Sequence, residues 1–407
     1  MTTNSEPTAV LGPEVLRERA EAVVPLLREN AARTERERQV VAENVDAIKE
    51  AGLFRLSVPK EYGGHGVGIR AALEICAELG RGCGSTSWIV SLLNSGAFTV
   101  TTFPEEAQRE VFADPDGLVC GVILGSEVHT ERVEGGYLVS GRWGYASGSH
   151  HSRWALLGRV PLPAHDGHPA RHGGVLLPMS ELTVEDTWHV AGMCGTGSNT
   201  LVADKVFAPD HRVLTFSRSV IADDLRADGG RKPVDLGLQV HAVRRALLVF
   251  GLAAPLLGMA QQAYELVIAN LEKGRRIAYS EYQDAREAPA VQMAVAQAAQ
   301  LIDESRLHAR RAADELDAAE EGRAALDLAA QTRVRVDVAR VAVNCRSAVE
   351  LLLDANGAGS FASGNPLQRV WRDIEVASRH GIINPLMARE VSGRLAVGLG
   401  KTVVWGE

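Results

Sequence analysis

The sequence predicts a mainly α protein with a central β domain, in the order helices, sheet, helices. Aromatic residues make up only 5% of the 407 residues while Ala is abundant, and this balance favours close-packed helices over an all-β sandwich. Apolar residues recur at helical spacing near both ends of the chain, whereas short Val- and Leu-rich runs between Gly pairs fill its middle. We therefore expect domains at residues 1–117, 118–232 and 233–407.

The first domain is helical from about residue 12 to about residue 112. Val45, Ile48 and Leu53, for example, recur at a spacing compatible with one helix face. Residues 57–64 (SVPKEYGG) form a turn-rich break, and we expect a second helical stretch to begin near Ile69.

The second domain contains short apolar runs typical of strands. Gly135 and Gly136 fit a hairpin turn between two of them. Several short strands at this spacing indicate a compact sandwich or barrel. The predicted strands are residues 118–124, 137–143, 154–160, 175–179 and 200–207.

The third domain returns to helical periodicity after a polar connection at residues 223–235. Pro255 either kinks or starts its helix, and Pro289 fits the first turn of the next. Long Ala-rich helices of this kind usually pack as a bundle, often continued across subunits. Two apolar stripes support this prediction: Leu252, Leu256, Met259 and Ala263, and then Val291, Val295, Ala298 and Ile302.

Composition excludes several classes of function. Acidic residues outnumber basic ones, 51 to 43, and the net charge of −8 weighs against nucleic acid as a partner. The sequence contains no run of about 18 uncharged apolar residues, so we expect no membrane association. Five cysteines without a CxxC pair indicate a reducing, cytoplasmic location and no structural zinc. His165, His168 and His172 lie among Pro and Gly residues, which favours a solvated loop over a metal site.

Residues 143–151 (WGYASGSHH) end a predicted strand with an aromatic residue, a hydroxyl and two imidazoles. Such an end can offer backbone and hydroxyl groups to a flat ring. The alternative is a turn in which Ser147 bonds locally and the histidines are exposed. No GxGxxG motif follows a strand, which argues against a Rossmann dinucleotide site.

Residues 371–381 (WRDIEVASRHG) carry the second candidate group. If they are helical throughout, Asp373, Val376 and His380 share one side. An imidazole titrates near neutrality and can give or take a proton during turnover. The alternative is an ordinary core or surface histidine.

Five segments, in this order, resemble the signatures of the acyl-CoA dehydrogenase superfamily: residues 57–64 (SVPKEYGG), 192–198 (GMCGTGS), 204–209 (DKVFAP), 356–359 (NGAG) and 372–373 (RD). The resemblance covers nearly the whole chain. It implies an N-terminal helical domain, a central β domain, a C-terminal four-helix bundle and a homotetramer with flavin near the domain and subunit boundaries.

Two departures from the dehydrogenases resemble the flavin-dependent monooxygenases built on the same fold. Residues 122–127 (VILGSE) replace the usual T-E-P-x-x-G-S-D, and His380 stands before Gly381 where many dehydrogenases have a catalytic glutamate. The resemblance implies the oxygenase component of a two-component system, supplied with reduced FAD, or FMN, by a separate NAD(P)H:flavin reductase. With O₂ it would hydroxylate a phenolic, indolic or polycyclic small molecule through a flavin hydroperoxide.

The resemblance also assigns roles to residues. Ser147 would bond near the flavin N5 edge, with backbone contacts from Tyr145 and Ala146. His380 would face the other side as a base, an acid or a substrate anchor. Trp88 would line the substrate pocket, unless it is simply helix core.

Further residues are assigned to the substrate and to the flavin tail. Ser91 and Asn94 follow Trp88 and are candidates for substrate contact. Arg276, with Tyr279, resembles the R-x-x-F element that reaches a neighbouring subunit's cofactor, and an arginine suits a diphosphate. Asn356 and Gly357 would join it, which favours FAD over FMN.

Two other functions stay open. An acyl-CoA dehydrogenase or oxidase would need another base, and Glu375 is the nearby carboxylate. A non-enzymatic member would keep the fold as a flavin-binding assembly module.

Overall fold

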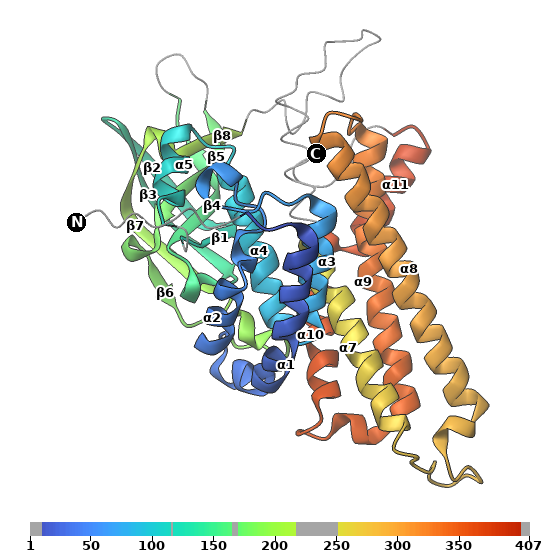
Figure 1. Cartoon of the computed structure of the whole chain (residues 1–407). Coiled ribbons are helices and arrows are strands. Elements are labelled where there is room, and N and C mark those ends of the chain that lie inside the picture. The colour runs from blue at the N-terminus through green and yellow to red at the C-terminus, as the bar shows by residue number, and fades with distance from the viewer. Residues whose placement is uncertain (1–9, 115–116, 165–169, 217–250, 400–407) are drawn as a thin grey trace.

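The computed structural model describes residues 10–114, 117–164, 170–216 and 251–399. It confirms a mainly α protein with a central β domain, in which helices precede and follow two small sheets (Figure 1). The polar connection and the predicted boundary near residue 232 lie outside the described residues. Among the described residues, no helix is both long enough and apolar enough to cross a membrane.

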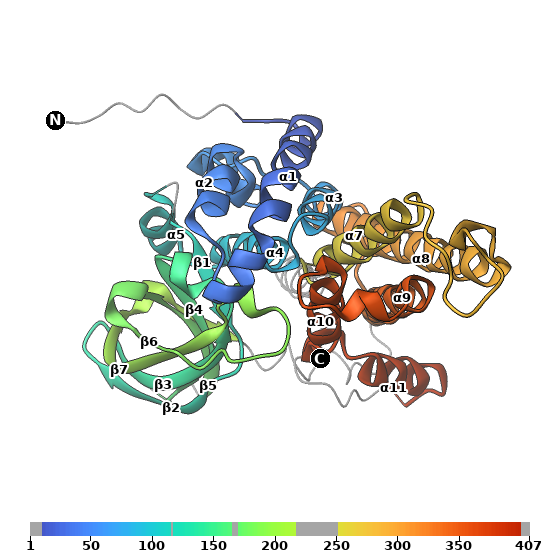
Figure 2. The same cartoon turned by 90° about the horizontal axis from the view of Figure 1, so that it is seen from below.

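The N-terminal helices lie between the sheets and the C-terminal helices, as the view from below makes clear (Figure 2). Helix α4 is the central one, and almost all of its residues are buried. Small residues permit this close packing, because a Cβ at Gly84 would lie 2.4 Å from the Met259 sulfur and one at Gly96 2.2 Å from the Val119 carbonyl oxygen. The five helices are α1 (Pro13–Glu37), α2 (Ala42–Glu50), α3 (Ile69–Gly80), α4 (Gly84–Val100) and α5 (Glu105–Phe112).

The central domain consists of two four-stranded sheets, with strand orders β1-β4-β5-β8 and β2-β3-β7-β6. The five predicted strands are present, with different ends, and Gly135, at φ 75°, turns the β2–β3 hairpin as predicted. The strands are β1 (Val119–Val122), β2 (Ser126–Val133), β3 (Gly136–Ala146), β4 (Trp154–Leu162), β5 (Arg171–Pro178), β6 (Thr183–Glu185), β7 (Asn199–Pro209) and β8 (Val213–Phe216).

The end of β3 bends toward α4. The register between β3 and β7 shifts between Trp143 and Ala146, and such an irregularity redirects the side chains that follow it. Trp143 anchors the bend, because its indole is fully buried and donates to the Gly158 carbonyl oxygen at 3.1 Å. The residues that follow therefore leave the sheet and face the helices.

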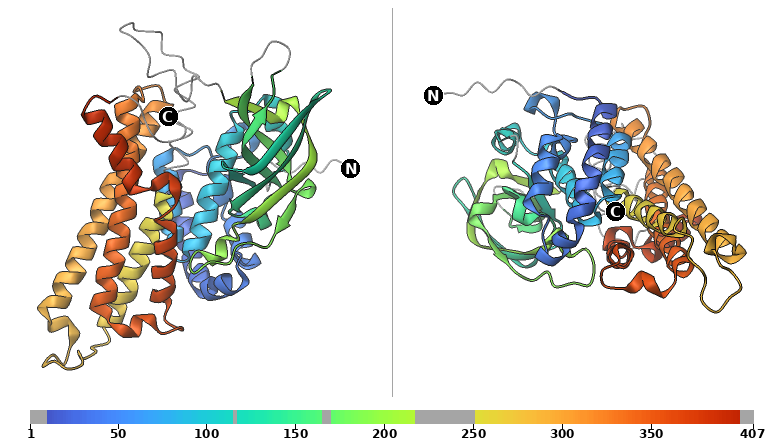
Figure 3. Two further views of the ribbon diagram at one scale, coloured as in Figure 1. Left: turned by 180° about the vertical axis from the view of Figure 1, so that it is seen from behind. Right: turned by 60° about the horizontal axis from the view of Figure 1, so that its bottom comes forward.

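The C-terminal helices form the elongated bundle seen from behind in Figure 3. The two apolar stripes predicted from the sequence face its interior, and Pro289 opens α8 as expected. Pro255 lies in the first turn of its helix. Gly80 of α3 meets Gly258 so closely that a Cβ on Gly80 would lie 2.8 Å from the Gly258 Cα. The helices are α7 (Ala253–Leu271), α8 (Pro289–Glu320), α9 (Leu328–Asn356), α10 (Pro366–Ala377) and α11 (Pro385–Ala396).

Candidate functional site

Ser147 lies where the sheet domain, α4 and the chain beyond α10 meet. Its hydroxyl is buried, accepts a hydrogen bond from Trp88 Nε1 at 3.3 Å and lies 2.7 Å from the Ser198 hydroxyl. The Trp88 ring in turn stands edge-on to the His380 ring, with 5.8 Å between the ring centroids. Three residues distant in the sequence, which the resemblance had assigned to one site, are thus neighbours in space.

Two further hydroxyls belong to this cluster, and the sequence reasoning did not single them out. Ser198 Oγ lies 2.6 Å from Thr196 Oγ1, which donates to the Met193 carbonyl oxygen at 2.9 Å. Thr196 lies within a turn bounded by Met193 and Gly197, whose φ values are 57° and 54°, and Ser198 directly follows that turn. Both hydroxyls belong to the GTGS segment at residues 195–198, which resembles a family signature, but nothing in the sequence pattern pairs them with Ser147.

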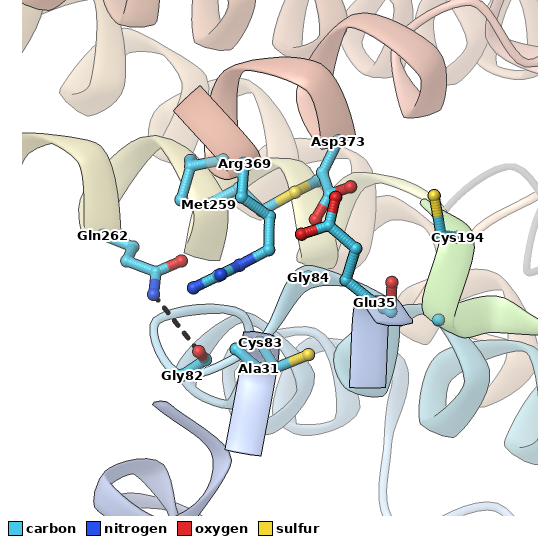
Figure 4. A pocket seen from close by; sticks show the side chains of 13 residues that line it. Ala31, Glu35, Gly82, Cys83, Gly84, Cys194, Met259, Gln262, Arg369 and Asp373 are labelled. Carbon is cyan, nitrogen blue, oxygen red and sulfur yellow. Dashed lines mark hydrogen bonds between the residues drawn. The ribbon is translucent and has the colours of Figure 1, made fainter. Parts of the chain in front are cut away.

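Asp373 of α10 holds the turn between Met193 and Gly197 in place. Its carboxylate accepts from the Met193 backbone N–H and is buried beside Glu35, which pairs with Arg372 at 2.5 Å. Figure 4 shows the carboxyl groups of Asp373 and Glu35 turned toward each other. Burial, with a smaller contribution from Glu35, raises the pKa of Asp373 to about 6. The cavity beside Asp373 measures about 10 Å³, about what one water molecule needs and far too small for a flavin.

His380 does not lie on α10, because that helix ends at Ala377. The condition for a shared helix face, a helix that continues through His380, is therefore not met. Instead His380 caps a short turn, with its Nδ1 accepting from the Ile382 backbone N–H at 3.3 Å. Burial lowers the pKa of His380 to about 4, so the ring is neutral near pH 7. Because Nδ1 accepts, we assign the proton of the neutral ring to Nε2.

Tyr145 and Ala146 precede Ser147 at the bend. The Tyr145 side chain is 77% exposed, and its backbone has a φ of 66°, a rare conformation for a bulky residue. Its ring meets Trp188 edge-on, with 5.7 Å between the centroids. Ala146 is fully buried. The bend thus turns the Tyr145 side chain outward and the Ser147 side chain inward.

Ser91 and Asn94 share α4 with Trp88 and are both buried. The Asn94 amide donates to the Leu53 and Val90 carbonyl oxygens, each at 2.9 Å, and accepts from the Ser57 backbone N–H at 3.1 Å. Its hydrogen-bonding groups therefore have backbone partners within the chain. This bonding gives Asn94 a role in holding the turn at residues 57–64 against α4.

The residues predicted for the flavin tail lie elsewhere. The connection between α7 and α8, which contains Arg276, occupies the lower end of the bundle in Figure 1. Arg275 fastens this connection by donating to the Ala355 carbonyl oxygen at 2.6 Å, while Arg276 is exposed. Asn356 is buried and bonds to Asn270 and Ser360, with Gly357 after it at φ 75°. One chain does not bring these residues to Ser147.

The groups around Ser147 suit the flat, nitrogen-containing ring of a flavin. The indole of Trp88 lies against the Ser147 hydroxyl, which offers a polar contact, and the exposed Tyr145 side chain precedes Ser147 on the sheet side. His380 adds a neutral imidazole that can hold or pass a proton at Nε2. No three His, Cys, Asp or Glu side chains of the described residues are grouped as a metal site requires. The arrangement favours organic cofactor chemistry with one proton-carrying side chain.

Two family models match the chain. Residues 14–115 match the acyl-CoA dehydrogenase N-terminal domain and residues 250–385 match the acyl-CoA dehydrogenase C-terminal domain. Both agree with the helical regions on either side of the sheets.

Two of the proteins to which the chain is similar are oxygenase components of flavin-dependent enzymes. The chain is 31% identical to the flavin-dependent monooxygenase oxygenase subunit HsaA of Rhodococcus jostii, over 94% of this chain and 98% of that protein. It is 32% identical to the oxygenase component of an FADH₂-dependent resorcinol hydroxylase of a Rhizobium species, over 94% and 93%. A solved structure of XiaF from a Streptomyces species, in complex with FADH₂ and glycerol, superposes with a TM-score of 0.87 at 34% identity, covering 96% of this chain and 97% of that one.

Proposed function

This chain belongs to the acyl-CoA dehydrogenase family, among the oxygenase components of flavin-dependent monooxygenases, and we propose that the Ser147 cluster is where its reduced flavin and its substrate meet. The enzyme uses reduced flavin and O₂ to hydroxylate an aromatic small molecule. The observation that carries the assignment of the site is the convergence of Ser147, Trp88 and His380 from three distant parts of the chain.

Bound there, reduced flavin supplies the activation of O₂ and the transfer of one oxygen atom to the aromatic ring. The protein's share is to bind the ring system, exclude water and place a proton. Ser147 holds the N5 edge, while Tyr145 and Ala146 contact the cofactor from the bend at the end of β3. These groups are fixed by the sheet and by α4, so little reorganisation accompanies turnover.

His380 handles the proton on the substrate side. Its neutral ring carries hydrogen on Nε2, so it enters turnover as a hydrogen-bond donor to a phenolic oxygen or to the departing oxygen. Trp88, in edge contact with His380, forms a wall of the same pocket. Ser91 lies one turn beyond Trp88, and we place it near the substrate, whereas Asn94 positions α4 through its backbone bonds.

The flavin tail requires a second copy of the chain. Arg276 lies between α7 and α8, and Asn356 and Gly357 lie at the end of α9, whereas Ser147 follows β3, so we propose that these three residues contact the cofactor held by a neighbouring subunit of a homotetramer. This favours FAD over FMN, because an exposed arginine offers paired donors to a diphosphate. A separate NAD(P)H:flavin reductase supplies the reduced cofactor.

The dehydrogenase alternative receives no support at its proposed base. Glu375, near the end of α10, forms an ion pair with Arg379, which lies just beyond that helix.

An anaerobic titration separates the two activities. Protein loaded with oxidised FAD should keep its yellow absorbance when a panel of acyl-CoA thioesters is added without O₂. With chemically reduced FAD, O₂ and a panel of phenols and indoles, it should yield a product one oxygen atom heavier. Bleaching of the oxidised flavin by an acyl-CoA, without any oxygenated product, would establish a dehydrogenase instead.

A further inference from the structure

A continuous row of hydrogen bonds leads from Trp88 through three hydroxyls to a backbone carbonyl. Trp88 Nε1 donates to Ser147, the Ser147 and Ser198 hydroxyls lie 2.7 Å apart, and those of Ser198 and Thr196 lie 2.6 Å apart. Thr196 then donates to the Met193 carbonyl oxygen at 2.9 Å. All three hydroxyl residues are buried.

Counting hydrogen atoms gives this row a direction. Each hydroxyl has one hydrogen to donate. The hydrogen of Thr196 goes to Met193, so the bond between Thr196 and Ser198 uses the hydrogen of Ser198. The bond between Ser198 and Ser147 must then use the hydrogen of Ser147. Ser147 consequently donates inward, and its remaining lone pair faces the site as an acceptor.

The opposite direction is possible but costs one hydrogen bond. If Ser147 donated outward, Ser198 would donate to Ser147 and Thr196 to Ser198, and the bond from Thr196 to Met193 would be lost. Trp88 Nε1 donates to Ser147 in either direction and favours neither. The preference therefore originates at Thr196, the far end of the row.

We propose that Thr196 is a positioning residue that makes the site select reduced over oxidised flavin, by keeping Ser147 a hydrogen-bond acceptor. The inference rests on the proposed function, in which Ser147 contacts the flavin N5 edge. Reduced flavin carries a hydrogen on N5 and donates there, whereas N5 of oxidised flavin has only a lone pair and needs a donor. An acceptor Ser147 matches the first and opposes the second.

The test compares Thr196→Val with Thr196→Ser. Valine has nearly the same shape but no hydroxyl, so Ser198 loses its inner acceptor and Ser147 becomes free to donate outward. Serine keeps the hydroxyl and serves as the conservative control. Dissociation constants for oxidised FAD in air and for reduced FAD under anaerobic conditions give a ratio for each protein, and the reduction potential of bound FAD gives a second readout.

The wild type and Thr196→Ser should favour reduced FAD. Thr196→Val should lower that preference about tenfold, the worth of one hydrogen bond, and lower the potential of bound FAD by about 30 mV, since a tenfold change corresponds to that value for a two-electron couple. Ser198→Ala removes the neighbouring link and should act in the same direction, which keeps the test valid if Thr196→Val does not fold.

An unchanged ratio and potential in both Thr196→Val and Ser198→Ala, in proteins that still hydroxylate, would overturn the role of Thr196 and leave the proposed function intact. A wild type that binds no reduced flavin and forms no oxygenated product would overturn the proposed function, and this inference with it.

Discussion

His380 reaches the site as a residue between two helices, held by the Ile382 backbone N–H on one side of its ring and by the Trp88 edge on the other. These contacts fix its orientation, and burial keeps it neutral by lowering its pKa to about 4. A group so placed can donate from Nε2 without first losing a proton to solvent.

Replacing His380 with Ala should leave reduced-flavin binding intact and lower the hydroxylation rate about 10²–10⁴-fold, the usual worth of a proton-transfer group. Single-turnover product formation under O₂, set against the affinity for reduced FAD, measures the two effects separately. His172→Ala, an exposed histidine on β5, is the matched control. Product formation at the wild-type rate by the His380 variant would exclude the histidine from the chemistry.

Helix α4 and the turn between Met193 and Gly197 hold the site together. Asn94 ties α4 to the turn at residues 57–64, and Asp373 ties α10 to Met193. The sequence predicted a helix in the region of α4 and made Asn94 a candidate for substrate contact. The bonds of Asn94 to Leu53 and Ser57 join distant segments, so no local sequence pattern reveals them. The sequence pattern did not reveal β2, because its residues (SEVHTERV) are mostly polar on both faces, and it did not show that α10 ends before His380.

Asn94→Ala should lower the free energy of unfolding by about 1–3 kcal/mol, because it leaves buried backbone groups without partners. The KM for the aromatic substrate should stay near the wild-type value in the folded variant. Denaturant unfolding and steady-state kinetics provide both numbers. Thr99→Ala, which removes one bond within the same helix, should cost less. A rise in KM without loss of stability would return Asn94 to the substrate pocket.

Asp373→Asn should change how stability depends on pH. The pKa of Asp373 is raised from 3.8 to about 6 in the folded protein, so the folded state binds its proton more tightly than the unfolded state does. This tighter proton binding stabilises the folded state at low pH, and the stabilisation is lost as the pH rises from about 4 through about 6. The variant lacks it, so its stability relative to the wild type should rise by at most about 3 kcal/mol between about pH 4 and pH 7.

Thermal unfolding of the two proteins across that pH range tests this expectation. His151 and His380, whose pKa values burial lowers to about 4, act in the opposite sense. They are present in both proteins and so cancel in the difference. A difference in stability that does not vary with pH would show that Asp373 titrates as an ordinary carboxyl.

The sequence predicted the order of helices and sheets along the chain because long periodic helices and alternating strands are local patterns. The residues of the site come from separate regions, and their meeting depends on packing that no local pattern contains. The resemblance supplied Ser147, His380 and Trp88, and the fold explains why they meet. Thr196 and Ser198 emerged only once their distances to Ser147 were known.

Mixed oligomers test whether neighbouring subunits share the cofactor. His380→Ala and Arg276→Ala chains should each be poorly active alone with FAD. After they are unfolded and refolded together, some sites would combine an intact His380 with a neighbour's intact Arg276. Activity should then exceed the sum of the separate proteins. Strict additivity would place the whole flavin site within one chain.

The most direct measurement of the enzyme's activity follows isotopically labelled dioxygen into product. Protein supplied with chemically reduced FAD, labelled O₂ and a panel of phenols and indoles should form a hydroxylated compound that carries one labelled oxygen atom, and Ser147→Ala should divert more of the oxygen to hydrogen peroxide. Product oxygen that comes from water, or oxygen consumption that yields only hydrogen peroxide with every compound in the wild type, would contradict a monooxygenase.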